Sequence, residues 1–167
     1  MDVREAIRGR RSIRKYKAGA VIPKADIESI LEAAMMAPSA RNMRPWEFVV
    51  VLNEEKKKKI MEFSPYTRML ETASAAIIVC GITDEPEALS FWPQDCGAAI
   101  ENLLLEAEAL GYGTCWCGFY PVMDRVKLLQ EEFGISSVPL AVIALGVPEE
   151  EPAARGYYEA SKVRYVE

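Results

Sequence analysis

Apolar positions repeat at the helical spacing of three and four residues in several stretches of the chain. Asp2 and Glu5 form a capping-box pattern at the first of them, and Gly9 is placed to end that helix in a left-handed turn. The stretch from Asp95 to Leu110 has the most extensive apolar face, which predicts a central or interface helix. The predicted helices cover residues 2–9, 23–37, 54–63, 95–110 and 122–133, of which 54–63 is a charged surface helix.

Short apolar runs rich in β-branched residues lie between these helices and predict strands. They cover residues 48–52, 75–80, 114–118 and 140–145, with residues 163–166 as a further candidate. Residues 84–93 predict a mobile excursion. Because the strands are few and two helices precede the first of them, we expect a layered α+β domain rather than a doubly wound one. The sequence has no G-x-G-x-x-G and no phosphate-loop pattern, which argues against a classical dinucleotide fold.

Length and composition predict one ordinary globular domain spanning residues 1–167. No apolar run reaches the roughly 18 residues of a membrane-spanning helix, and the first residues lack a secretory pattern, so we expect a cytoplasmic protein without membrane contact. The net charge of −5 argues against broad nucleic-acid binding, although residues 8–17 are locally basic.

The four cysteines, at positions 80, 96, 115 and 117, match neither a C-x-x-C redox motif nor a paired zinc motif. We expect reduced, mostly buried thiols and no metal site. The chain has no histidine, which excludes Ser-His and Cys-His nucleophile systems and the commonest general base. We therefore predict no catalytic side chain and expect an organic cofactor to supply any redox chemistry.

Two basic clusters stand near opposite ends of the sequence. The first is Arg10-Arg11-Ser12-Ile13-Arg14, and the second contains Lys162 and Arg164. Arginine forks and a serine hydroxyl suit the charge and the acceptor oxygens of a phosphate monoester. The pair of clusters predicts a phosphorylated ligand held between them, whereas the first cluster alone is equally compatible with a solvated basic turn.

Three further motifs stand in order between these clusters: PSARNMRPW, QDCGAAIENLLLEAEALGYGT and Cys117-Gly118. Together the motifs resemble the FMN-dependent nitroreductase family over nearly the whole chain, from Arg10 to Arg164. The resemblance implies a three-layer α+β fold with a central, mostly antiparallel sheet flanked by helices. It also implies an intertwined homodimer that exchanges its C-terminal tails and binds one FMN in each of two sites at the subunit interface.

The resemblance also assigns roles to individual residues around the FMN. Arg14 would reach the pyrimidine side of the ring, where a cation stabilises the reduced, negatively charged flavin. The other residues implied at the phosphate and ribityl chain are Arg10, Arg11, Ser12, Lys162 and Arg164.

Pro38, Ser39 and Asn42 resemble the family's loop that crosses the interface, where Asn42 would offer a donor and an acceptor to the ring edge. Asn42 is alternatively a loop-capping side chain. Many relatives have glutamine where this chain has Arg44, so an extra charge enters this loop and its role is open.

Cys117 and Gly118 match the family's backbone segment against the flavin ring, where glycine permits close approach. A reactive Cys117 thiol is the weaker alternative. We expect Trp116 to be a core residue. Three other aromatic residues either line an acceptor pocket or act as hydrophobic plugs, with the plug favoured: Tyr66, Phe91 and Trp92.

The function implied is an FMN-dependent NAD(P)H oxidoreductase that reduces a nitroaromatic, quinone or flavin by a ping-pong cycle. The alternative is a non-catalytic FMN-binding redox sensor or flavin store, and a third, weaker candidate is a zinc or nucleic-acid module. The sequence leaves open the physiological acceptor, the choice of NADH or NADPH, and which chain of the dimer supplies each flavin contact.

Overall fold

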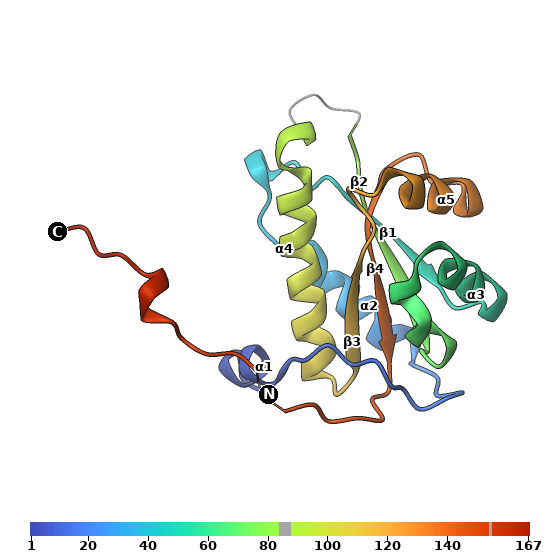
Figure 1. The fold of residues 1–167 in the computed structure, drawn as a ribbon, viewed down its shortest axis with the longest axis horizontal. Coiled ribbons are helices and arrows are strands. Elements are labelled where there is room, and N and C mark those ends of the chain that lie inside the picture. The colour runs from blue at the N-terminus through green and yellow to red at the C-terminus, as the bar shows by residue number, and fades with distance from the viewer. Residues whose placement is uncertain (84–87, 154) are drawn as a thin grey trace.

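A four-stranded antiparallel sheet in the order β1-β2-β4-β3 forms the centre of the described structure (Figure 1). The computed structural model describes residues 1–83, 88–153 and 155–167. The two inner strands are almost wholly buried runs of Ala, Val, Ile and Leu, which suits strands covered on both faces. The strands are β1 (Trp46–Val51), β2 (Ala75–Gly81), β3 (Gly113–Gly118) and β4 (Val138–Gly146).

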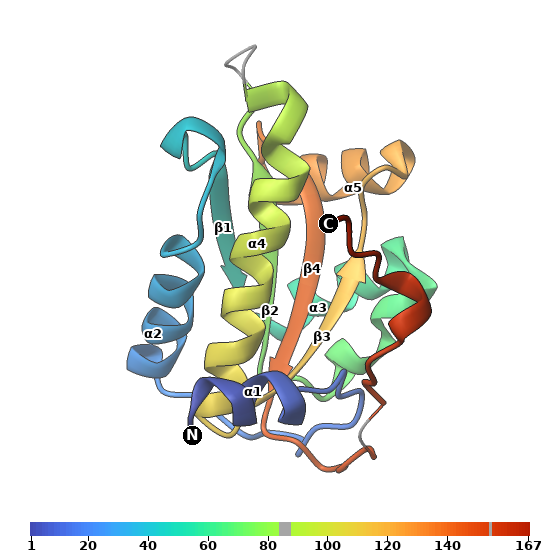
Figure 2. The ribbon, with the colours of Figure 1, turned by 90° about the vertical axis from the view of Figure 1, so that its left-hand side faces the viewer.

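Helices cover both faces of this sheet and make three layers (Figures 1 and 2). Alternate residues of β2 face opposite ways, so Ile77 packs with α2 and α4 while Ile78 packs with α3 and α5. The α-helices are α1 (Val3–Gly9), α2 (Lys24–Met35), α3 (Glu54–Phe63), α4 (Ala88–Ala109) and α5 (Met123–Phe133). Short 3₁₀ segments are η1 (Ala40–Asn42), η2 (Pro65–Glu71) and η3 (Ala160–Lys162).

This architecture confirms the predicted α+β layers and the mostly antiparallel sheet. The capping box at Asp2 and Glu5 is formed, and Gly134 ends α5 in a left-handed conformation with φ of 63°. Most predicted helices and strands lie within a few residues of their observed bounds. No described helix is long and apolar enough to cross a membrane.

Several local predictions were wrong. Gly9 lies inside α1 without a left-handed turn, and a Cβ there would come within 2.8 Å of Glu108 Oε1. The charged surface helix at residues 54–63 is formed as predicted, but its inner face also buries Lys57, which is 1% exposed, donates to the Ala73 carbonyl and pairs with Glu54 at 2.8 Å. Residues 88–93 belong to α4 instead of an excursion, and residues 84–87 lie outside the described part of the chain.

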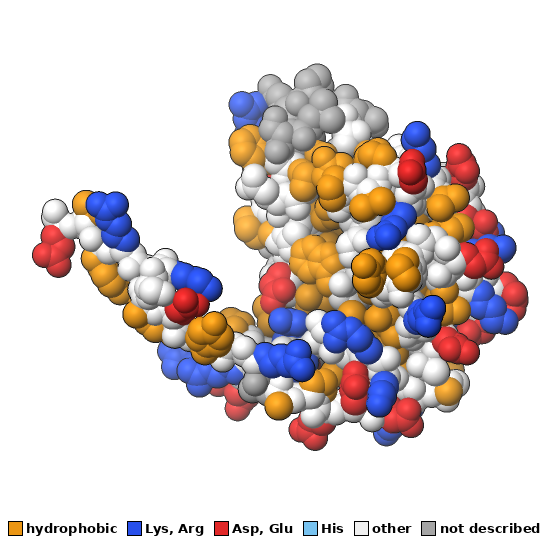
Figure 3. Space-filling view, viewed as in Figure 1, with side chains coloured by type: hydrophobic (Ala, Val, Ile, Leu, Met, Phe, Trp, Pro, Cys, Tyr) orange, Lys and Arg blue, Asp and Glu red, His pale blue; other side chains and the backbone are white. Residues whose placement is uncertain are grey.

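The predicted strand at residues 163–166 is not formed either. The tail beyond residue 155 leaves the body as an arm (Figures 1 and 3). Tyr165 is 81% and Val166 83% exposed. A strand needs a neighbour for its main-chain hydrogen bonds, and no strand of residues 1–83 or 88–153 lies beside the arm.

The segment after α1 runs along the outer side of β3. The Ile13 N–H donates to the Thr114 carbonyl at 2.8 Å, and the segment reaches β4's end where Tyr16 bridges Pro148. Gly113 and Gly146 are cross-strand partners, and they make room for these side chains. A Cβ on Gly113 would lie 2.9 Å from Ile13, and one on Gly146 would lie 2.7 Å from the Tyr16 ring.

We predict that Gly146→Ala destabilises the protein by forcing Tyr16 off the sheet. Overpacking of this kind costs about 1–3 kcal/mol, or roughly 2–12 °C in Tm for a chain of this size. Gly118→Ala is the matched control, because no atom lies within 4 Å of the added Cβ. Thermal unfolding of the ligand-free protein should separate the two variants, and an equal Tm for both would contradict this packing.

Candidate functional site

The outer edge of β3 carries main-chain groups that the sheet does not use. The Phe119 N–H donates to the Leu140 carbonyl at 2.9 Å, and the Thr114 carbonyl accepts from the Ile13 N–H on the other side of the strand. The N–H and C=O groups of the odd-numbered residues of β3 therefore point toward β4, and those of the even-numbered residues point outward. Ile13 covers the edge at Thr114. Beyond it, the N–H and C=O groups of Trp116 and Gly118 point outward and have no hydrogen-bond partner among the described residues.

Gly118 also leaves space above this edge, because a Cβ built there meets no atom within 4 Å. A hollow of about 550 Å³ lies against the same edge. This volume is in the usual range for small-molecule sites. Its lining residues are Arg14, Pro65, Tyr66, Arg68, Met69, Cys115, Trp116, Cys117 and Gly118.

Cys115 and Cys117 share one face of β3 and point toward η2. Cys117 Sγ lies 3.2 Å from the Tyr66 carbonyl oxygen and 3.9 Å from Met69 Sδ. The hydrogen bond from Cys117 and the charge of Arg14 hold the pKa of Cys115 at about 7, below its usual value, while that bond and burial raise the pKa of Cys117. Among the described residues, no group of three or more His, Cys, Asp or Glu side chains is placed to hold a metal ion.

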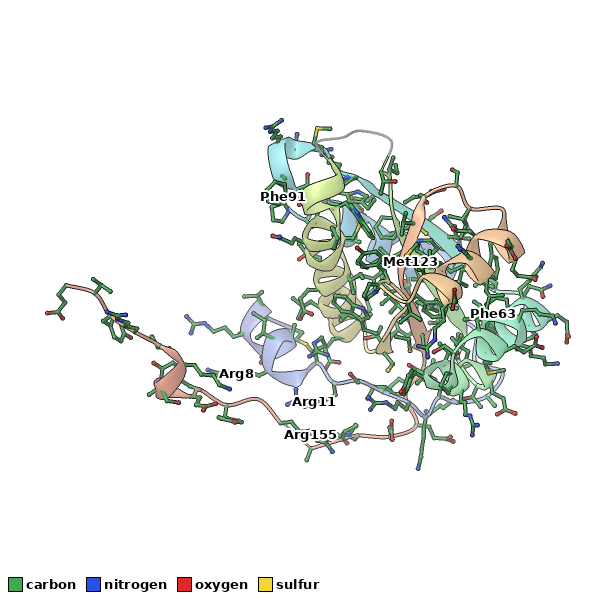
Figure 4. The ribbon with its side chains drawn as sticks, turned by 45° about the horizontal axis from the view of Figure 1, so that its top comes forward. Arg8, Arg11, Phe63, Phe91, Met123 and Arg155 are labelled. Carbon is green, nitrogen blue, oxygen red and sulfur yellow. The ribbon has the colours of Figure 1, made fainter. Side chains whose placement is uncertain are left out.

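A second hollow, of about 730 Å³, lies at the root of the tail. Its lining includes five cationic side chains and one carboxylate, which favours an anion. Arg11 and Arg155, which both line this hollow, are labelled in Figure 4. The charged and hydroxyl residues that line it are Arg10, Arg11, Ser12, Arg14, Lys15, Glu150 and Arg155.

Contacts with α4 and with residues 150–153 fix this basic segment. Arg10 Nε lies 3.4 Å from Glu101 on α4, and Arg11 donates through Nε to the Ala153 carbonyl at 3.3 Å. The Arg14 N–H donates to Glu150 Oε1 at 2.6 Å. Because Arg14 lines both hollows, the cationic hollow and the β3 edge adjoin.

The structure does not bring Lys162 and Arg164 to the first basic cluster within one chain. Both lie on the projecting tail (Figure 3), and Lys162 pairs locally with Glu159 at 2.6 Å. The predicted anion clamp is therefore not assembled by a single chain.

The loop with Pro38, Ser39 and Asn42 is also separate from the β3 edge, because α4 lies between them (Figure 2). This loop is unusual in its backbone: Arg41, Asn42 and Arg44 have φ of 53°, 57° and 48°. Such left-handed conformations cost most non-glycine residues about 1–2 kcal/mol each. Non-glycine strain of this kind is concentrated at functional sites.

The predicted aromatic residues have different roles. Trp92 is 4% exposed and packs edge-on against Tyr120 with ring centroids 4.9 Å apart, as expected for a plug. Phe91 is half-exposed near the start of α4 (Figure 4). Trp116 was predicted to be a core residue, and this was wrong: it is 40% exposed and lies 3.8 Å from the Cβ position of Gly97. Its side chain points to the opposite face of β3 from the buried Cys115 and Cys117, toward α4, which covers it only in part.

Sequence reasoning missed three residues. Arg68 lines the β3 hollow from η2, Arg155 lines the cationic hollow, and Asp95 accepts from the Ala40 N–H at 3.0 Å beneath the 38–44 loop. Arg68 and Arg155 lie in irregular segments without a motif. Asp95 carried a signal, because a carboxylate at the edge of a strongly apolar helix needs a partner.

The family model described as Nitroreductase family matches residues 7–66 and 64–147. This chain belongs to the nitroreductase family. A Methanothermobacter thermautotrophicus relative provisionally named NADH dehydrogenase/NAD(P)H nitroreductase is 46% identical over 165 residues, which are 98% of this chain and 86% of the relative.

Solved structures agree with this membership. A Parabacteroides distasonis protein with the same provisional name is 36% identical with a TM-score of 0.92, covering 98% of this chain and 96% of its own. An FMN-dependent nitroreductase of Clostridium difficile is 31% identical with a TM-score of 0.85, covering 96% of each chain. The chain therefore has a nitroreductase fold and belongs to a family of NAD(P)H oxidoreductases.

We predict that iodoacetamide labels Cys115 first in the ligand-free protein, with a rate that rises through about pH 7. Cys117→Ala removes the neighbouring thiol whose interaction lowers the pKa of Cys115, so that pKa rises and the labelling profile of Cys115 moves to higher pH. Cys80 and Cys96 serve as internal controls, because burial raises the pKa of each to about 12. Mass spectrometry of the labelled peptides measures the profile, and an unchanged profile in Cys117→Ala would contradict the assignment.

Proposed function

We propose that this protein is an FMN-dependent NAD(P)H oxidoreductase that reduces a small acceptor. One observation carries the proposal: the cationic hollow and the open edge of β3 adjoin along the segment that contains Arg14. FMN has the matching form, with a phosphate at one end and a flat, polar-edged ring at the other. The name of the C. difficile structure supports the same cofactor.

The cationic hollow fits the phosphate end. Its guanidinium groups and the Ser12 hydroxyl supply charge-assisted and neutral donors from several directions. Arg11 and Arg155 come from opposite ends of the sequence, so the hollow forms only in the folded chain. In this proposal Arg10, Arg11 and Ser12 hold the phosphate and the ribityl chain.

The edge of β3 fits the ring end. The outward N–H of Gly118 donates to the ring edge, and the missing Cβ lets the ring come close to the Cys117-Gly118 main chain. Arg14 and Arg68 place two positive charges beside this edge, where they favour the negatively charged reduced ring. Bound FMN would supply the redox chemistry, accepting electrons from NAD(P)H and passing them on.

A second copy of the chain completes the site in this proposal. The described surface exposes large apolar side chains on α1, at the end of α2 and along the tail, more than an isolated chain needs. The tail has no place on its own body, and the 38–44 loop cannot reach its own β3 edge past α4. In an intertwined homodimer, Lys162 and Arg164 join the phosphate, and Pro38, Ser39 and Asn42 join the ring.

Arg164→Ala tests the phosphate clamp. Charge-assisted hydrogen bonds contribute roughly 1.5–3 kcal/mol, so FMN affinity should fall at least about tenfold, while affinity for riboflavin, which lacks the phosphate, changes little. Fluorescence titration measures both. Lys24→Ala, which removes an 88% exposed charge on α2, is the control. Equal losses for both flavins would place Arg164 in folding or assembly, and no loss would place it outside the site.

Anaerobic stopped-flow absorbance separates an enzyme from a flavin store or sensor. The enzyme assignment predicts that NADH or NADPH bleaches the flavin band rapidly, and that a nitroaromatic, quinone or free flavin then restores it in a second, independent phase, as a ping-pong cycle requires. An open site without a fixed general acid should accept several flat acceptors. A band that neither nucleotide bleaches would instead support the non-catalytic store or sensor.

A further inference from the structure

Arg44 is a charged residue of the 38–44 loop that the proposed function leaves without a role. Its guanidinium Nε donates to Asn42 Oδ1 at 3.0 Å. Both residues are exposed, so neither is held there by burial. The contact joins the extra charge directly to the side chain that is expected to meet the flavin ring.

The orientation of the Asn42 amide follows from the chemistry of its partner. A guanidinium has five N–H donors and no acceptor. The Asn42 atom that faces Arg44 must therefore be the carbonyl oxygen, and the opposite amide NH₂ is turned away from Arg44. The usual ambiguity between the oxygen and nitrogen of an asparagine amide is removed by a partner of this kind.

The loop around this pair is fixed by contacts of its own. The Arg44 N–H donates to Ser39 Oγ at 2.9 Å, and the Ala40 N–H donates to Asp95 Oδ1 at 3.0 Å. Asp95 is 7% exposed, so the anchor lies under the loop and away from water. Asn42 and Arg44 both have left-handed backbone conformations, so the loop bends sharply at the two residues whose side chains form the pair.

We propose that Arg44 is a positioning residue that fixes the Asn42 amide so that Asn42 presents only its NH₂ donor to the flavin ring. This inference rests on the proposed function, which places Asn42 at the ring of the partner's site. A donor at the ring edge stabilises the electron-rich reduced ring more than the oxidised one, because reduction increases the negative charge on ring acceptors. Arg44 therefore raises the reduction potential of the bound flavin through Asn42.

A glutamine at position 44 would have different consequences. A glutamine amide offers both a donor and an acceptor, so it pairs with either face of the Asn42 amide and leaves that amide free to turn over. The arginine side chain, which only donates, restricts the Asn42 amide to one orientation. The substitution Arg44→Gln should therefore give a riboflavin affinity and a flavin reduction potential between those of the native protein and those of Arg44→Ala.

A double-mutant cycle tests this inference, with riboflavin affinity measured on the FMN-free protein and the reduction potential on the FMN-loaded protein. The variants are Asn42→Ala, Asn42→Asp, Arg44→Ala, Arg44→Gln and the double alanine variant. Riboflavin affinity and flavin reduction potential are the readouts, because riboflavin excludes phosphate effects and a merely structural role would not move the potential. Lys24→Ala controls for the loss of a surface charge, and Tm checks folding.

Asn42→Ala should weaken riboflavin binding by about three- to tenfold, the usual range for one hydrogen bond, and should lower the potential. Arg44→Ala should have a smaller effect of the same sign, and Arg44→Gln a smaller one still. In the Asn42→Ala background, Arg44→Ala should add nothing. Asn42→Asp keeps the bond to Arg44 but replaces the donor by an acceptor, so it should bind riboflavin no better than Asn42→Ala.

Independent, additive losses from the two alanine substitutions would overturn the positioning role, and so would native affinity in Asn42→Asp. The proposed function survives both of these results. If Asn42→Ala changes neither readout, Asn42 does not meet the ring and the inference falls, while the comparison of FMN with riboflavin in Arg164→Ala still judges the cofactor site by itself.

Discussion

The hydrogen-bond register of β3 determines the rest of the candidate site. Pairing with β4 through the odd-numbered residues turns the main chain of Thr114, Trp116 and Gly118 outward. The segment after α1 uses the first of these positions, through the bond from Ile13 to Thr114. Together with the hydrogen bonds between residues 14–17 and 147–150, that contact lays the basic cluster along the sheet, and the segment turns away before it reaches Gly118. A one-residue slip would turn the odd-numbered main-chain groups outward and remove the open edge at Gly118.

The segment at residues 10–16 combines positive charge with close packing along the outer edge of β3. Arg14 stands between the cationic hollow and the β3 edge, so one side chain acts on both the expected phosphate end and the expected ring end of a ligand. Gly113 and Gly146 allow Ile13 and Tyr16 to lie flat against the sheet. The position of this segment therefore follows from backbone pairing and close packing, and its basic side chains are placed as a result.

Elements with a strong local pattern were predictable from the sequence. The α4 face, the buried strands and the capping box at Asp2 each depend on neighbours in sequence or on simple burial. Features that depend on tertiary contacts were not: Gly9 packs against Glu108 instead of turning, and Trp116 lies at a sheet edge instead of in the core. The basic motif at residues 10–14 was found because its residue types suit phosphate, whereas Arg68 became visible only when η2 was placed beside β3.

A two-chain flavin site is the central claim, and a mixed dimer tests it most directly. Gly118→Val blocks the β3 edge, and Asn42→Asp spoils the loop, so each homodimer should bind FMN weakly at both sites. If the edge and the loop come from different chains, a heterodimer of the two variants has one site with both defects and one intact site. We predict one FMN per heterodimer bound with native affinity, measured by titration of differently tagged, co-purified chains. A heterodimer that binds FMN no better than the two homodimers would contradict the account.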